Sequence, residues 1–171
     1  MQTDTERKIY YNKNRVRVRE SQLSDIMIMG DNLRETDKNE IWASHHHTPE
    51  EALLLSFNSA ISCFTVENKD VPVALFGISP FTLLDNKASI WLLATDSFDA
   101  LIKKNRKEFI RQSKIFIGFL LEQYPLLENY VDARNIPSVR WLRLCRAKVE
   151  EAKPYGIEKL PFHYFSFRRN N

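Results

Sequence analysis

The feature that most constrains this 171-residue chain is a β-prone run that leads directly into a short amphipathic helix, within the stretch 129–145. Asp132 and Asn135 are both good N-cap residues, and Pro137 stands where a first helical turn tolerates a missing N–H group. After the proline, apolar and basic residues each recur every three positions, as Val139, Leu142 and Cys145 and as Arg140, Arg143 and Arg146. The stretch therefore predicts a strand that is followed at once by a helix with one apolar and one basic face.

This stretch resembles a segment of the GCN5-related N-acetyltransferases (GNATs), in which an Asn precedes a small residue by three positions and the following aromatic or Leu-containing helix ends at Gly-Phe. Asn135 and Ser138 stand at those two positions here. Among GNAT-like proteins, the sequence is most similar to the internal core protein of short-tailed bacteriophages, which has Arg-Phe-Leu or Arg-Trp-Leu on this helix and an apolar, aromatic C-terminal strand. The resemblance covers residues 88–167 and, more loosely, residues 16–78.

The resemblance implies an α/β (α+β) fold of the GNAT type, with a mixed, mostly antiparallel central sheet of about six or seven strands flanked by about four helices. The residue patterns predict matching strands at 15–19, 61–66, 72–78, 88–94, 126–131 and 162–167. They predict helices at 24–33, after Thr48, at 104–124 and after Asn135, and a short helix or turn at 37–43. Gly77, inside one of these strands, indicates a bulge or a close backbone approach.

Length and composition limit the organisation of the chain. With 43% hydrophobic residues, it is long enough for one core, so we expect a flexible N-terminal arm over 1–14 and a single GNAT-like domain over 15–171. Its apolar runs are far shorter than the roughly 20 residues of a membrane span, and its polar N-terminus lacks the apolar core of a secretory signal. Cys63 and Cys145 lack metal-type spacing and fit a reducing compartment.

Residues 45–47 are three consecutive histidines, a residue type that commonly binds metal ions. Three adjacent imidazoles cannot all face one ion on regular backbone, and no Cys, Asp or Glu partner stands at ligand spacing. We interpret them as a polar loop before the next helix. That helix is predicted to begin with Thr48 as N-cap, Pro49 at the first position and Glu51 completing a capping box.

In the GNAT family, the central strand leads to a loop of the form Gln/Arg-x-x-Gly-x-Gly/Ala, whose backbone N–H groups hold the pyrophosphate of acetyl-CoA. The corresponding stretch here, 95–106, contains no glycine. Asp96 and Asp99 would repel a pyrophosphate, whereas the basic residues Lys103, Lys104, Arg106 and Lys107 would attract one. Since these cations stand near the start of the predicted helix 104–124, where the helix dipole disfavours them, they indicate a nearby anion or a solvated basic turn.

If acetyl-CoA binds, the resemblance assigns it to the end of the central strand, the basic turn and the helix Asn. The residues concerned are Leu93, Ala94, Thr95, Lys103, Lys104, Arg106 and Asn135. Acetyl-CoA is the only cofactor that the sequence suggests, and no metal is expected.

The group that would transfer a proton is also altered. Active GNATs often have a Tyr seven residues after the helix Asn, where this chain has Leu142, which cannot exchange a proton. The usual Gly after the helix is Arg146. The remaining catalytic candidates are Glu40, Tyr130 and Cys145, and the sequence spacing does not choose among them.

These observations leave three functions open. The first is a catalytically degenerate GNAT-fold phage protein that acts as a structural or interaction component of the virion, in core assembly or genome delivery. The second is an acetyl-CoA-dependent N-acetyltransferase that modifies an amine on a host or phage target.

The third function is nucleic-acid contact through Arg15, Arg17, Arg19 and the cluster 103–107, although a net charge of +3 is too balanced to argue for it alone. Expected partners are other virion proteins or a host protein. The expected location is the host cytoplasm during infection or the virion interior, without export by a signal peptide.

Overall fold

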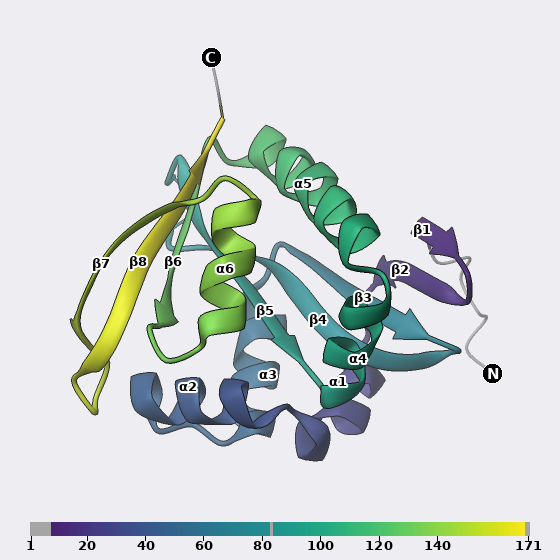
Figure 1. Cartoon of the computed structure of the whole chain (residues 1–171), viewed down its shortest axis with the longest axis horizontal. Helices are drawn as coiled ribbons and strands as arrows, with labels where there is room; N and C mark the ends of the chain where they lie inside the picture. The colour runs from purple at the N-terminus through teal and green to yellow at the C-terminus, as the bar shows by residue number, and fades with distance from the viewer. Residues whose placement is uncertain (1–7, 83, 170–171) are drawn as a thin grey trace.

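The fold is described from a computed structural model, which describes residues 8–82 and 84–169 (Figure 1). Within these residues, one sheet of eight strands has the order β1-β2-β3-β4-β5-β6-β8-β7. The strands are β1 Ile9–Lys13, β2 Val16–Glu20, β3 Ser62–Asn68, β4 Val71–Pro80, β5 Lys87–Ala94, β6 Leu126–Asp132, β7 Lys148–Tyr155 and β8 Leu160–Arg168. Neighbouring strands are antiparallel except β5 and β6, which are parallel.

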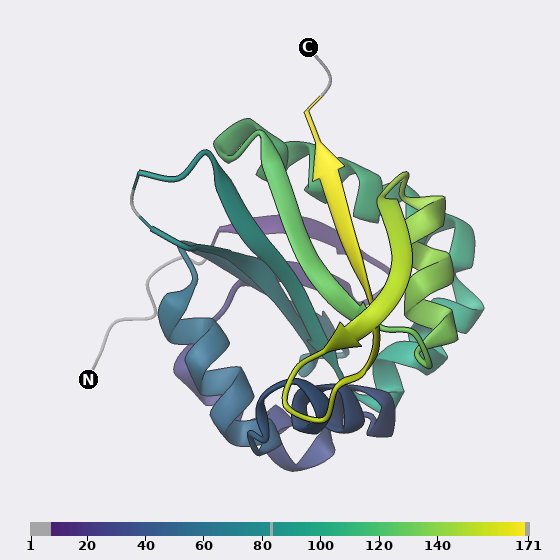
Figure 2. The same ribbon diagram turned by 90° about the vertical axis from the view of Figure 1, so that its left-hand side faces the viewer.

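Helices cover both faces of this sheet. They are α1 Leu23–Met29, α2 Glu35–His45, α3 Pro49–Ser59, α4 Asp96–Lys104, α5 Arg106–Gln123 and α6 Ile136–Leu144, with a 3-10 turn, η1, at Gly30–Asn32. The sheet separates α5 and α6 from α3 (Figure 2). Adjacent residues of β4 consequently belong to different buried clusters. Ala74 packs in the cluster under α5 and α6, and Leu75 packs in the cluster under α1 and α3. The mixed, mostly antiparallel GNAT-like architecture is confirmed, with more strands and helices than predicted.

Several local predictions are confirmed by backbone geometry. Asn135 is the N-cap of α6, and its side chain accepts a hydrogen bond from the Ser138 N–H, so the β6–α6 junction has the predicted form. Thr48 and Glu51 form the predicted capping box of α3. Gly77 is a site of close approach, because a Cβ atom there would lie 2.4 Å from the carbonyl oxygen of Ser62.

The helix predicted at 104–124 is confirmed as α5, which begins at Arg106. The helix α4 before it was not predicted, and the two are separated at Asn105, whose φ is −130° and ψ 34°. Lys103 and Lys104 therefore lie in the last turn of α4, where the helix dipole favours cations. Arg106 and Lys107 are the first two residues of α5, so for them the predicted conflict with the helix dipole remains.

Strand β2 does not expose its arginines as predicted. Arg19 is only 4% exposed and donates to Asp25 and Glu67, while Arg17 donates to Glu67 and Asp70. Helix α1 supplies Asp25, so it covers the strand face that the alternating pattern assigned to solvent. The charges of both arginines are compensated within the fold, which removes them from the candidate nucleic-acid contacts.

Two further segments differ from expectation. The stretch 1–14, expected to be an arm, contains β1, which pairs with β2, while residues 1–7 lie outside the described residues. Strand β7 was not predicted, and it forms the sheet edge beside β8. Among residues 8–82 and 84–169, no helix combines the length and apolar character needed to cross a bilayer.

Arg146 takes the place of the family glycine at a position that suits glycine. Its φ is 71°, in the left-handed region that side chains with a Cβ atom disfavour. We expect Arg146→Gly to raise the free energy of unfolding by about 1 kcal/mol, since relief of strain outweighs the added entropy of the unfolded chain. Urea unfolding would measure the change, and a loss of stability would show that the Arg146 side chain contributes more than the strain costs.

Candidate functional site

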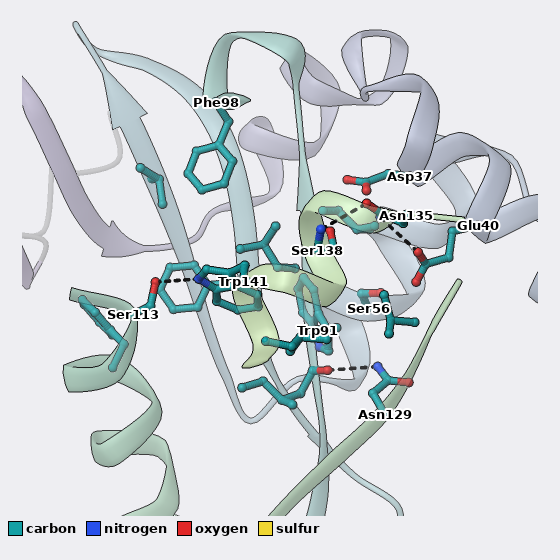
Figure 3. A pocket seen from close by; sticks show the side chains of 18 of the residues that line it. Asp37, Glu40, Ser56, Trp91, Phe98, Ser113, Asn129, Asn135, Ser138 and Trp141 are labelled. Carbon is teal, nitrogen blue, oxygen red and sulfur yellow. Dashed lines mark hydrogen bonds between the residues drawn. The ribbon is translucent and has the colours of Figure 1, made fainter. Parts of the chain in front are cut away.

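The central feature of the candidate site is the divergence of the two parallel strands. β5 and β6 pair only from Lys87 and Leu126 to Ser89 and Glu128, and then separate (Figure 1). At the point of separation, the Asn129 amide donates a hydrogen bond of 2.9 Å to the Ile90 carbonyl oxygen and bridges the gap (Figure 3). Divergent strands leave a space that side chains must line.

A cavity of about 1010 Å³ is associated with this gap and is lined mostly by apolar and aromatic side chains. Its aromatic lining residues include Phe76, Trp91, Phe109, Phe116, Tyr130 and Trp141. Trp141 is held in place by a hydrogen bond of 3.1 Å from its Nε1 to the Ser113 hydroxyl oxygen (Figure 3). Such a concave, largely apolar space with a few polar groups is typical of ligand-binding sites.

The polar groups of this cavity come from α2 and the start of α6. The Asn135 amide donates to the Glu40 carboxylate at 3.3 Å, and Asp37 lies close by (Figure 3). Burial raises the pKa of Glu40 to about 7, and the negative charge of Asp37 adds to the increase. A carboxyl group whose pKa is near neutrality can accept or release a proton at physiological pH.

Glu40 should make stability depend on pH. Its pKa is near 7 in the folded protein but ordinarily 4.5, so the folded state binds this proton more tightly and the free energy of unfolding falls as the pH rises between those values. Glu40→Gln keeps an acceptor for Asn135 but cannot ionise. We expect the variant to be more stable than the wild type by on the order of 2 kcal/mol at pH 8 and about equal to it at pH 4. Urea unfolding at both pH values would measure this, and parallel pH profiles would contradict it.

The junction between β5 and α4 is closed by residues from the N-terminal third of the chain. The Asp37 carboxylate accepts a hydrogen bond of 2.8 Å from the Ala94 N–H, and the Arg34 N–H donates to the Ala94 carbonyl oxygen at 2.9 Å. The Arg34 guanidinium contacts Asp37 at 2.9 Å and donates to Asp99, in the first turn of α4, at 2.7 Å. The Thr95 N–H donates to the Val73 carbonyl oxygen.

The contacts at this junction indicate whether a pyrophosphate could bind there. The backbone groups of Ala94 are already bonded, and the first turn of α4 carries two carboxylates, Asp96 and Asp99. A helix start binds anions through free N–H groups and a positive local potential. The two carboxylates of its first turn therefore make the start of α4 unsuitable for a pyrophosphate.

The predicted cofactor residues separate into three groups. Leu93, Lys103 and Asn135 line the cavity. Ala94 and Thr95 are buried at the closed junction. Lys104 and Arg106 are exposed and lie outside the cavity lining.

The predicted catalytic candidates are also separated. Glu40 and Tyr130 line the cavity, and the Tyr130 ring stacks on Tyr155 with centroids 3.8 Å apart. Cys145 is 5% exposed and packs in the core under α6, where burial raises the pKa of its thiol to about 11. The structure thus brings Glu40 and Asn135 together and leaves Cys145 apart from them.

Arg34, Asp37 and Asn129 are the polar residues of this region that sequence reasoning missed. The spacing of Asp37 and Glu40, three apart on one helix, was a usable signal that both carboxylates share a face. Arg34 and Asn129 carried no signal, because each contacts a distant part of the chain. The histidines 45–47 stack locally, with His46 also paired to Glu158, and the described residues contain no group of three metal-ligating side chains.

Residues 71–152 match the family model described as "Bacteriophage T7, probable scaffold protein Gp13". No curated protein matches the sequence.

Among solved structures, the chain is similar to ribosomal-protein-S5-alanine acetyltransferase from Vibrio fischeri, at 15% identity and a TM-score of 0.65, with 94% of this chain and 97% of that chain covered. It is also similar to spermidine N-acetyltransferase from Vibrio cholerae in complex with CoA and spermine, at 12% identity and a TM-score of 0.66, with 91% and 96% covered. A GNAT-family acetyltransferase from Bacillus anthracis has 12% identity and a TM-score of 0.63, with 94% and 98% covered. The chain therefore has the fold of the GCN5-related N-acetyltransferases, and its residues 71–152 resemble the bacteriophage T7 scaffold protein family.

Proposed function

We propose that this chain is a non-catalytic GNAT-fold component of a phage particle, which binds other virion proteins during core assembly or genome delivery. The observation that carries the proposal is the closed β5–α4 junction. Arg34 and Asp37 occupy the backbone groups of Ala94, and Asp99 occupies the first turn of α4. The match of residues 71–152 to a phage scaffold family supports a role in the particle.

The charge distribution along α4 supports the same conclusion. Its first turn holds Asp96 and Asp99, whereas Lys103 and Lys104 are in the last turn, roughly 10 Å further along the axis. Each end thus carries the charge that stabilises the helix itself. A pyrophosphate at the N-terminal end would face two carboxylates. The arrangement favours a stable helix over a phosphate site.

Acetyl-CoA should therefore fail to stabilise the protein. A ligand present at 100 times its dissociation constant stabilises by about 2.7 kcal/mol, or roughly 5–10 °C for a chain of this length. We expect no shift in the unfolding temperature at millimolar acetyl-CoA. The spermidine N-acetyltransferase from Vibrio cholerae, whose structure contains CoA, is the positive control. A shift of several degrees that saturates with concentration would contradict a non-catalytic role.

The role in the particle has a separate test. Particles from cells infected by the phage that encodes the chain would be purified on a density gradient and analysed by quantitative mass spectrometry. We expect the chain to sediment with the particles or their precursors at a constant copy number. Recovery only in the soluble fraction, together with normal particle yield from a deletion mutant, would contradict the role.

The environment of Glu40 favours a second candidate function, that of an N-acetyltransferase acting on a host or phage amine. The Glu40 carboxyl group lies in the cavity beside Asn135 and has a pKa of about 7. At neutral pH it could therefore accept a proton from a bound ammonium group and leave a nucleophilic amine. Acetyl transfer to a panel of peptides that Glu40→Gln abolishes would establish this candidate in place of the first.

A further inference from the structure

The positive charge of this chain is concentrated in one part of its sequence. Residues 103–146 contain ten basic and four acidic side chains, although the whole chain has a net charge of only +3. Eight of these basic residues are exposed, and we call them the basic face: Lys103, Lys104, Arg106, Lys107, Lys114, Arg140, Arg143 and Arg146. In the described part of the chain none of them pairs with a carboxylate, whereas nearby Arg111 and Arg134 pair with Glu108 and Asp132.

The helices that carry the basic face are packed side by side. The Phe98 ring of α4 meets the Phe109 ring of α5 with centroids 5.5 Å apart, and Phe109 stacks on Trp141 of α6 at 6.0 Å. These aromatic contacts turn the inner sides of the three helices toward one another and toward the sheet. The three helices lie on the side of the sheet that faces the viewer in Figure 1.

Helical periodicity arranges the charges in two stripes. On α5, Lys107 and Lys114 are exposed and seven residues apart, about two helical turns, and Arg111 between them pairs with Glu108. On α6, Arg140 and Arg143 are three apart, and Arg146 follows the helix.

We propose that the basic face binds the phosphate backbone of double-stranded nucleic acid, without reading its sequence. Several unpaired cations on three helices that pack side by side fit a duplex, which carries one negative charge per roughly 1.7 Å of its axis. Arginine forks match phosphate oxygens in two-point hydrogen bonds. This function goes beyond the proposed role in the particle and does not depend on it.

The orientation of Trp141 favours a duplex over a single strand. Trp141, the aromatic residue of α6, points inward to Ser113 and Phe109, so the arginine stripe offers no ring on which an unpaired base could stack.

The test is binding of a fluorescent 30-base-pair duplex DNA of mixed sequence to the full chain, measured by anisotropy between 50 and 200 mM NaCl. If about five phosphates are contacted, the logarithm of the association constant should fall with the logarithm of salt concentration with a slope of about −4.5. Arg140→Glu/Arg143→Glu should reduce the slope by about 2 and weaken binding at least tenfold at 100 mM salt.

The matched control is Lys69→Glu/Lys153→Glu, which changes the net charge equally at two exposed positions outside the basic face. It should retain binding within about threefold. A second variant, Lys103→Glu/Lys107→Glu on α4 and α5, should lose binding like the α6 variant, which keeps the test decisive if one variant unfolds.

If all three variants, including the control, lose binding equally, the basic face is not the binding site and binding reflects only the net charge of the protein. Polyglutamate that competes as well as duplex DNA at equal charge would assign the face to an acidic protein instead. Tighter binding of single-stranded than of double-stranded DNA would overturn the duplex assignment. None of these results alters the acetyl-CoA test, so the two proposals fail independently.

Discussion

Replacing Asp25 by Asn is expected to lower the free energy of unfolding by about 3–5 kcal/mol, because it removes one of the two carboxylates, Asp25 and Glu67, that pair with the buried Arg19 guanidinium. Asp25 is 0% exposed and accepts two hydrogen bonds of 2.8 Å from Arg19. It also accepts from the Thr65 hydroxyl at 2.6 Å and from the Gln22 N–H at 3.0 Å. An amide can neither accept at every one of these points nor neutralise Arg19. Urea unfolding would measure the loss.

The matched control is Asp70→Asn, which removes a carboxylate that pairs with Arg17 but whose side chain is 79% exposed. An exposed pair contributes about 0–1 kcal/mol, so this variant should be nearly as stable as the wild type. If Asp25→Asn costs no more than Asp70→Asn, the buried network does not hold α1 against the sheet.

The same network should make the free energy of unfolding of the wild type depend on pH in the acid range. Burial raises the pKa of Asp25, but the hydrogen bonds from Arg19, Thr65 and Gln22 outweigh it and leave the pKa below its ordinary value. The folded state therefore binds this proton more weakly than the unfolded chain. The stability that Asp25 contributes is present above its unfolded pKa and is lost as the pH falls through its folded pKa, a loss that Asp25→Asn should lack.

Replacing Gly77 by Ala is the second change with a large expected effect, a loss of about 3 kcal/mol or more. Its Cβ atom would lie 2.4 Å from the Ser62 carbonyl oxygen, 3.1 Å from the Trp91 ring and 3.2 Å from the Cys63 Cα. Two of these are backbone atoms of a paired strand and cannot move aside as the end of a flexible side chain can. β3 and β4 would have to separate where they pair. Thermal and urea unfolding would both report the loss.

Gly118 offers the matched substitution. Gly118→Ala makes the same change in α5, where an added Cβ would meet nothing within 4 Å. Because alanine favours helix and restricts the unfolded chain, this variant should be more stable by about 0.5–1 kcal/mol. Equal stabilities for the two variants would show that the strands adjust around position 77 without cost.

Features that depend on residues close together in the sequence could be predicted from it. The capping box at Thr48 and Glu51 involves positions three apart, and the β6–α6 junction depends on Asn135 and Pro137, which are adjacent to the helix that they start. The hairpin of β3 and β4 joins neighbouring runs through a polar turn. Each of these is decided by contacts within a few residues, so local pattern was sufficient.

The features that the sequence did not predict depend on residues far apart in the sequence. The burial of Arg19 required Glu67, 48 residues away, and the closing of the β5–α4 junction required Arg34 and Asp99, 65 residues apart. The contact of Asn135 with Glu40 spans 95 positions. Alternation along β2 identified which side chains share a face but contained no information about the helix that covers it.

The sequence thus predicted the class of the fold through its resemblance to the GNAT family, and the same resemblance showed that the glycine loop and the Tyr are missing. Periodicity and capping predicted the individual strands and helices. Whether the remaining charges were solvated, paired or collected into a cavity became evident only from the folded chain. A charge interacts with whatever lies within a few ångströms of it in space, and in a sheet of eight strands those neighbours come from distant parts of the chain.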